Sequence, residues 1–254
     1  TAYEYRLMPY QTKQFRVLYE VYCNNEEFAT IQAVPVSKII PAQTVIVKFK
    51  NRLLYGNDII QVAQLFLKQS NLQYIGLTRL DLALDFNSFR NGLYPATFIQ
   101  RFLNSEILKV GQGKYTLIGS QKFGHVYDYL RYGSKTSEVN TYLYNKTKEL
   151  NQVVDKPYIR KKWILQNLNL SQDVWRLEVS IKSSGMSIVR LDTGELEKID
   201  FFRLNDSQYI SSIFFSYINQ YFRFVWDDGQ KNKTRMKPVR LFSSYVAEYK
   251  PLYL

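Results

Sequence analysis

The chain has 254 residues, of which 46% are hydrophobic and 22% are charged, and this composition indicates a globular protein and excludes a disordered one. Lys and Arg outnumber Asp and Glu by 34 to 22, and the resulting formal charge of +12 favours a polyanionic partner such as nucleic acid. The 21 Tyr and 16 Phe can stack on unpaired bases, although we expect most of them in the core.

Three features bear on the compartment and the extent of the chain. The single cysteine, Cys23, cannot form an internal disulfide, which fits an intracellular protein. No uninterrupted apolar run reaches the ~20 residues of a membrane-spanning helix, and no signal peptide is visible, so we expect a cytoplasmic protein without a membrane partner. The chain begins at Thr1 rather than at Met, so we expect further residues upstream, where a separate DNA-binding module would fit.

The first elements alternate between strand and helix. Runs of β-branched and aromatic residues predict strands over 14–22, 44–50 and 77–86. Asn57-Asp58 is expected to cap a helix over 58–70, whose apolar residues recur at helical spacing. The order strand, helix, strand over 44–86 predicts one packed α/β unit in which the helix covers one sheet face.

Later elements follow the same signals. Pro95 predicts the start of a helix over 95–108, and Gly133-Ser134-Lys135 predicts the turn of a hairpin over 125–146. The remaining predictions are strands over 114–118 and 174–182, helices over 157–168 and 207–224, and a basic loop over 229–240. The loop is as consistent with a solvated segment as with a DNA contact.

Three of the predicted strands carry polar groups at every second position, and a strand points alternate side chains to the same face. The residues that share a face are Asp81, Ala83 and Asp85; Asn140, Tyr142, Tyr144 and Lys146; and Arg176, Glu178, Ser180 and Lys182. Carboxylates, a tyrosine and lysines in these positions indicate a metal-assisted site that acts on phosphate.

The scarcity of His and Cys limits the chemistry. His125 is the only histidine, so a Ser-His-Asp triad would have one possible base, and nucleases that hold their ion with a His-hydrophobic-His pair are excluded. Zinc sites need more Cys or His, so any ion would be held by carboxylates, which suits Mg²⁺ or Mn²⁺. The absence of a GxxxxGK[ST] loop argues against ATP hydrolysis of the P-loop type.

The two aspartates of the first strand cannot act alike. Four strand residues span roughly 13 Å, so Asp81 and Asp85 cannot ligate one ion without a bulge. We expect one of them to bind the ion together with Glu178, while the other caps the strand end or contacts a basic partner. The alternative is a purely structural salt-bridge network of the acidic pair with Arg79 and Arg176.

Tyr144 is the candidate nucleophile. A phenolate can attack a backbone phosphorus and leave a phosphotyrosine that conserves the bond energy for rejoining. Because the pKa of an unperturbed tyrosine is ~10, an ion or a lysine must favour the charged form, and Lys146 is expected on the same face. Tyr142 shares this face and is the chief rival.

The three motifs together resemble the replication initiation factor family (Rep_trans), which comprises rolling-circle plasmid initiators and related relaxases of integrative conjugative elements. They are TRLDLALDF over 78–86, LYNKTKE over 143–149 and WRLEV over 175–179, matching in order and spacing the family patterns T-R-[LI]-D-x-A-x-D-F, [IL]-Y-[ND]-K-x-x-E and W-R-[VL]-E-[IV]. The resemblance covers residues 40–182.

The resemblance implies that Tyr144 nicks the origin strand and becomes linked to its 5′-phosphate, with Lys146 beside it. It implies that Asp81 or Asp85 and Glu178 hold a divalent ion, Mg²⁺ or Mn²⁺. It also implies an α+β fold with a largely antiparallel central sheet, helices packed on it, and a distant architectural kinship with His-hydrophobic-His nucleases. DNA contacts are predicted for the neighbouring cations Arg79, Arg131, Lys148, Arg176 and Lys182.

We therefore expect residues 1–254 to form a single catalytic domain that nicks single-stranded or cruciform origin DNA and initiates rolling-circle replication. A host helicase and a second copy of the chain are further expected partners. Three alternatives remain open: a conjugative relaxase with the same chemistry, a non-catalytic protein that binds single-stranded DNA, and a structural protein whose charges form salt bridges.

Overall fold

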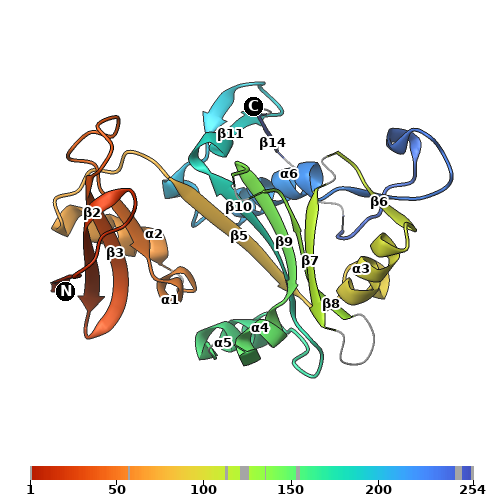
Figure 1. Cartoon of the computed structure of the whole chain (residues 1–254), viewed down its shortest axis with the longest axis horizontal. Coiled ribbons are helices and arrows are strands. Elements are labelled where there is room, and N and C mark those ends of the chain that lie inside the picture. The colour runs from red at the N-terminus through yellow and green to blue at the C-terminus, as the bar shows by residue number, and fades with distance from the viewer. Residues whose placement is uncertain are drawn as a thin grey trace. The chain divides into compact units, whose positions relative to one another are not determined.

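The chain packs as two compact units, residues 1–73 and 74–254, in the computed structural model (Figure 1). The structure describes residues 2–56, 58–111, 114–120, 126–134, 136–152, 155–243 and 248–252. Asn57, His125 and Lys135, which were singled out from the sequence, lie outside these ranges. All predicted catalytic, metal-binding and DNA-binding residues lie in the second unit, and whether one catalytic domain spans the whole chain stays a prediction.

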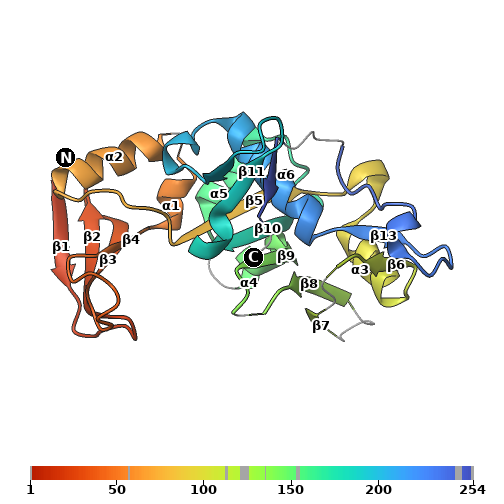
Figure 2. The ribbon, with the colours of Figure 1, turned by 90° about the horizontal axis from the view of Figure 1, so that it is seen from above.

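The first unit is an antiparallel four-stranded sheet with helix α2 packed on it (Figure 2). Its elements are β1 (Tyr3–Leu7), β2 (Phe15–Cys23), β3 (Glu26–Pro35), β4 (Ile46–Phe49), α1 (Asn51–Leu54) and α2 (Ile59–Gln69), with the strands in the order β1-β2-β3-β4. The ring of Phe66, on α2, meets the rings of Phe28 and Phe49 at centroid distances of 5.1 and 6.0 Å. Aromatic packing of this kind fixes the helix on the sheet.

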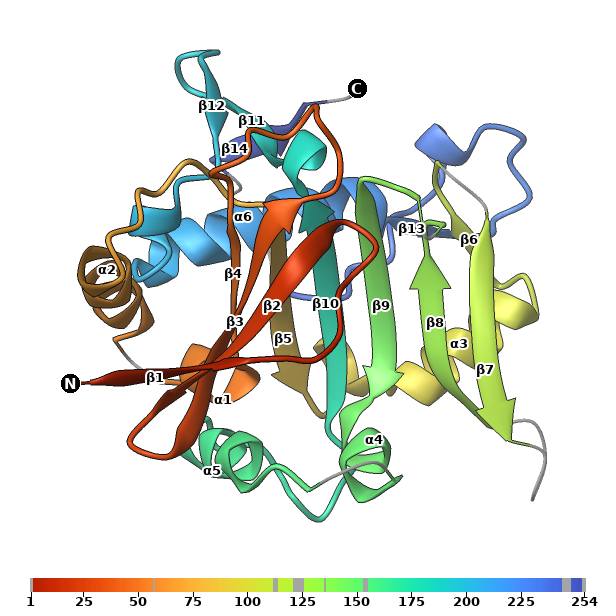
Figure 3. The ribbon, with the colours of Figure 1, turned by 60° about the vertical axis from the view of Figure 1, so that its left-hand side comes forward.

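The second unit is built on a five-stranded antiparallel sheet in the order β5-β10-β9-β8-β7 (Figure 3). The strands are β5 (Arg79–Phe86), β10 (Trp175–Lys182), β9 (Val139–Asn145), β8 (Val126–Tyr132) and β7 (Tyr115–Ser120). The two strands with the second and third motifs, β9 and β10, are therefore hydrogen-bonded to a neighbour on both sides.

Helices and two small sheets complete the second unit. The helices are α3 (Pro95–Leu103), α4 (Lys146–Gln152), α5 (Pro157–Leu165) and α6 (Ser207–Tyr221). The small sheets combine β12 (Leu196–Lys198), β11 (Ser187–Arg190) and β14 (Tyr249–Pro251), and β13 (Phe224–Trp226) with β6 (Ile107–Lys109). Short 3-10 turns lie at Arg90–Gly92, Ser183–Met186, Phe201–Arg203 and Lys233–Arg235.

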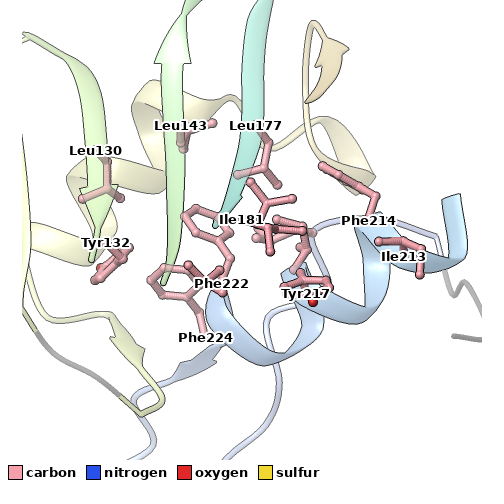
Figure 4. Packing of buried hydrophobic residues seen from close by; sticks show 14 of the residues in the cluster. Leu130, Tyr132, Leu143, Leu177, Ile181, Ile213, Phe214, Tyr217, Phe222 and Phe224 are labelled. Atoms are coloured by element: carbon pink, nitrogen blue, oxygen red, sulfur yellow. The ribbon is translucent and has the colours of Figure 1, made fainter. Parts of the chain in front are cut away.

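One face of the central sheet carries the core of this unit (Figure 4). Leu177 and Ile181 of β10 and Leu143 of β9 are fully buried there, together with Ile213 and Tyr217 of α6. Alternation along β9 and β10 then points their polar side chains to the opposite face. The expected α+β class, with a largely antiparallel sheet and helices packed on it, is confirmed.

Several sequence-based boundaries need correction. The expected α/β unit over 44–86 does not form, because β4 and α2 belong to the first unit while β5 joins the sheet of the second. The helix from Pro95 ends at Leu103, and Ile107 starts strand β6 instead. Two helix predictions that ran to 168 and 224 were also too long, because α5 ends at Leu165 and α6 at Tyr221.

Lys146 is not part of the strand that carries Tyr144, as the sequence had suggested, but begins helix α4. The backbone N–H groups of Lys146 and Thr147 both bond to the carbonyl of Val174, at 2.9 and 3.1 Å. The side-chain oxygen of Asn145 accepts from the backbone N–H of Lys148 at 2.8 Å, which is the contact of a helix N-cap. The chain therefore turns from strand to helix directly after Tyr144.

Candidate active site

The polar face of the central sheet, opposite helix α6, brings the three motifs together. In one row across the sheet, Arg176 of β10 lies between Asp85 of β5 and Tyr144 of β9. In the next row, Glu178 lies between Ala83 and Tyr142. The strands are thus in the register that gathers carboxylates, an arginine and two tyrosines on one surface, as the alternating pattern predicts.

Tyr144 is linked to the acidic side of this face. Its hydroxyl donates a hydrogen bond to Glu178 Oε2 at 3.1 Å, across the diagonal from β9 to β10. Burial, followed by the negative charge of Glu178, raises the pKa of Tyr144, while the charge of Arg176 acts in the opposite direction. Tyr144 is therefore protonated at neutral pH, and its proton already has an acceptor in place.

Glu178 shares its surroundings with a second carboxylate. Burial, followed by the negative charge of Asp81, raises the pKa of Glu178. Such a pair gains from a bound cation, and Mg²⁺ is commonly held by one or two carboxylates together with phosphate oxygens. Within the described ranges, no group of three or more His, Cys, Asp and Glu side chains could hold a metal. Asp81 and Glu178 lie on one face of the adjacent strands β5 and β10, and their role as ion ligands stays a prediction.

Asp85 has a different environment. It accepts two hydrogen bonds from Arg176, at 2.6 Å from Nε to Oδ1 and 2.7 Å from Nη2 to Oδ2. The indole N–H of Trp163 on α5 donates to the same Oδ2 at 2.7 Å. Both charged side chains are 9% exposed. Asp85 thus pairs with Arg176, and Asp81 pairs with Arg79, which are the contacts of the salt-bridge alternative that the sequence left open. The assignment of Asp85 as an ion ligand stays a prediction.

The lysines of the second motif are held by carboxylates. Lys146 is buried, forms an ion pair with Glu149, and its Nζ lies 5.5 Å from the centroid of the Tyr144 ring. Lys148 forms an ion pair with Asp128 on β8. Burial lowers the pKa of Lys146, and Glu149 acts in the opposite direction. Lys146 is thus beside Tyr144 although it reaches the site from a helix.

Two of the remaining predicted cations, Arg79 and Arg131, act on Tyr142, whereas Lys182 lies farther along strand β10. Arg79 Nε bonds to Asp81 Oδ1 at 2.8 Å in an exposed pair, and Lys182 lies opposite Arg79 in the register. Arg131 of β8 lies opposite Tyr142, and its Nη2 donates to Thr116 Oγ1 at 3.1 Å. Burial raises the pKa of Tyr142, and the charges of Arg79 and Arg131 oppose that rise.

Four neighbours of the site were not selected from the sequence. Trp163 contacts Asp85, and Asp128 contacts Lys148. Tyr129 of β8 lies opposite Tyr144. These depend on the pairing of distant segments, which no local pattern specifies. Asn145 was detectable, because Asn is one of the preferred residues at a helix N-cap.

Comparisons with known proteins give one informative result. No family model matches the chain, and no curated protein matches it. Among solved structures, the chain is similar to a rolling circle replication initiator protein from Geobacillus stearothermophilus, with a TM-score of 0.51 and 12% identity over 94% of this chain and 79% of that one. At this identity the likeness concerns the fold, and membership of the replication initiation factor family stays a prediction.

Proposed function

We propose that the protein nicks DNA through a covalent tyrosine intermediate and so initiates rolling-circle replication. The observation that carries the proposal is the hydrogen bond from the Tyr144 hydroxyl to Glu178 on a face that also holds Asp81, Arg176 and Lys146. The fold likeness to a rolling circle replication initiator supports it independently. The excess of 34 Lys and Arg over 22 Asp and Glu fits a DNA substrate.

In the proposed reaction, Tyr144 Oη attacks the scissile phosphorus in line with the leaving oxygen. The bond from Oη to phosphorus forms as the bond from phosphorus to the 3′ oxygen breaks, which leaves a 5′-phosphotyrosine and a 3′-OH. Glu178 Oε2 accepts the tyrosine proton, because it already accepts that hydrogen bond. The leaving oxygen takes a proton from solvent, and the 3′-OH primes synthesis.

The residues around Tyr144 have separate tasks. Arg176, fixed by Asp85, lies opposite Tyr144 in the register, where its charge favours the developing phenolate. Lys146 places a second positive charge beside the ring. Asp81 and Glu178 would hold Mg²⁺ or Mn²⁺, which when bound supplies positive charge to the phosphate oxygens. Arg79, Arg131, Lys148 and Lys182 are proposed DNA contacts.

The test is incubation with labelled single-stranded origin-region DNA and Mn²⁺, followed by a denaturing gel and mass mapping of the protein peptides. We expect an adduct on the peptide that contains Tyr144, lost in Tyr144→Phe and retained in Tyr142→Phe. Cleavage by Tyr144→Phe would refute the assignment and point to Tyr142. Binding without an adduct, across several sequences and ions, would instead indicate a DNA-binding protein without nicking activity.

Genetic experiments would distinguish a replication initiator from a conjugative relaxase. A conjugative relaxase would show the same adduct, so loss of element transfer rather than of plasmid replication would identify it. A host helicase and a homodimer stay predictions. In the described part of the chain, none of the helices has the length and apolar character needed to cross a membrane.

A further inference from the structure

The polar face of the central sheet is divided into two halves with different chemistry. The carboxylates Asp81, Asp85 and Glu178 come from the adjacent strands β5 and β10. Strand β9, which carries Tyr144, and its neighbour β8 contribute the aromatic and cationic side chains Tyr129, Arg131 and Tyr142. Strands β5 and β10 also carry Arg79 and Arg176, which pair with Asp81 and Asp85, whereas Arg131 on the other half donates to the neutral hydroxyl of Thr116. The half with Arg131 is therefore the one better suited to attract a polyanion.

The two tyrosines lie next to each other and next to Tyr144. The ring centroid of Tyr129 is 6.2 Å from that of Tyr142 and 6.4 Å from that of Tyr144. Tyr129 and Tyr142 are both half-buried, so both residues are partly accessible to solvent. Tyr129 is not needed for the proposed nicking reaction, and Tyr142 serves there only as the rival nucleophile.

Arg131 adds a positive charge beside these rings. It lies opposite Tyr142 and two residues from Tyr129 on the same strand face. Its hydrogen-bond partner, Thr116 Oγ1, is a neutral hydroxyl. By contrast, Arg176 and Lys148 are held by the carboxylates of Asp85 and Asp128. The charge of Arg131 is therefore the more available one for a phosphate.

We propose that Tyr129, Arg131 and Tyr142 form a stacking platform that binds the unpaired nucleotides next to the scissile phosphate. Bases stack on the two rings, and Arg131 contacts the backbone between them. The face of a base is accessible only when the strand is unpaired, so the platform selects melted over duplex DNA at the nick site. This inference rests on the proposed function and adds the part of the site that recognises the strand.

The test measures binding without cleavage, in EDTA, with a fluorescent oligo-dT of about 15 nucleotides and a matched duplex. Replacing one ring with a non-aromatic side chain should weaken single-strand binding roughly 5- to 150-fold, because one stacked base contributes about 1–3 kcal/mol. We expect this loss in Tyr129→Leu and Tyr142→Leu, and near-normal binding in Tyr129→Phe, which keeps the ring. Duplex binding should change much less.

A direct probe of stacking is a single 2-aminopurine in the oligo-dT, whose fluorescence falls when the base stacks. The wild-type protein should quench it, and Tyr129→Leu and Tyr142→Leu should restore the signal. Tyr94→Leu is the matched control, because Tyr94 is also accessible, at 48% exposure, but precedes helix α3 and is not on these strands. Circular dichroism shows that each variant is folded.

The outcomes separate this inference from the nicking function. Wild-type affinity and quenching in folded Tyr129→Leu and Tyr142→Leu would overturn the platform, even if the Tyr144 adduct still forms. An adduct that forms more slowly at low DNA concentration, but at the normal rate at saturating DNA, would support it. A wild-type protein that binds neither oligo-dT nor origin DNA would overturn the proposed function as well.

Discussion

At the scale of single residues, the two aspartates of strand β5 differ in what surrounds them. Asp85 and Arg176 form a buried pair, each 9% exposed, whereas the side chains of Asp81 and Arg79 are 40% and 59% exposed. A buried charge that loses its partner carries the full cost of desolvation, while an exposed one is solvated by water. The same substitution should therefore have different effects at the two positions.

Asp85→Asn should lower the free energy of unfolding by about 3–5 kcal/mol, because it removes the carboxylate that pairs with the buried Arg176 charge. Urea denaturation of the variant and the wild type measures this difference. A change of less than ~1 kcal/mol would show that Arg176 finds another partner or that water reaches it.

Asp81→Asn is the matched variant on the same strand. We expect a stability change within about 1 kcal/mol, because its pair with Arg79 is exposed. If Asp81 holds the ion with Glu178, DNA nicking should nevertheless be lost, or should require much more Mn²⁺. Normal nicking at the normal ion concentration would remove Asp81 from the ion site.

Lys109, in β6, gives a prediction for pH. Burial, followed by the charges of Lys233 and Arg223, lowers its pKa from 10.5 to about 8. The unfolded chain therefore holds this proton more tightly than the folded one, so the contribution to stability increases as pH rises from about 8 to 10.5. Below that range, the buried charge destabilises the fold.

Lys109→Met should accordingly be more stable than the wild type at neutral pH, and this advantage should shrink between about pH 8 and 10.5. Urea unfolding of both proteins across this range gives the difference, in which other titrating groups cancel. The exposed Lys231→Met is the control. A stability difference between the two proteins that does not change with pH would mean that the pKa of Lys109 is not lowered in the folded state.

At the scale of elements, the hairpin of β8 and β9 depends on Gly133. Its φ is +99°, and a Cβ atom there would lie 2.5 Å from Asn140 Oδ1 and 2.9 Å from the carbonyl oxygen of Val139. Gly194 also has a positive φ, of +74°, but nothing lies within 4 Å of the position of its Cβ. Alanine substitutions at the two positions therefore distinguish the effect of backbone strain alone from that of strain combined with steric overlap.

Gly133→Ala should be destabilised by more than the ~1–3 kcal/mol of an unfavourable backbone conformation, whereas Gly194→Ala should show only that amount. Thermal unfolding compares the two variants. Because the hairpin positions Tyr144, Gly133→Ala should also slow adduct formation. Equal melting temperatures would show that Asn140 moves aside without cost.

The elements also show where the sequence was informative. Alternation in β5, β9 and β10 correctly predicted which side chains share a face, because a buried core on one side leaves the polar groups on the other. The same logic placed Lys146 in the strand, and it missed the Asn145 cap that ends the strand first. Contacts such as that of Trp163 with Asp85 join residues 78 positions apart, which local patterns do not specify.

At the scale of the whole molecule, the chain divides into two units after residue 73. The expected α/β unit over 44–86 failed because the helix pattern of 59–69 indicates an element but not the sheet that it covers. All ten predicted site residues lie in residues 74–254, which also contain their own core. The first unit contributes none of them.

A chain of residues 74–254 should therefore fold alone and form the Tyr144 adduct with single-stranded DNA. Circular dichroism and the denaturing gel test these two expectations in turn. A folded fragment that binds DNA normally but forms no adduct would mean that residues 1–73 take part in the chemistry. Weaker binding with a normal adduct at saturating DNA would assign them to substrate capture.

The location of β9 and β10 has a consequence for local opening. Each is hydrogen-bonded on both sides, so exposing its amides to solvent requires the central sheet to separate. Amide hydrogens around Tyr144 and Glu178 should then exchange with deuterium only through global unfolding. On warming, Tyr144 and Glu178 should therefore keep their relative positions until the protein unfolds.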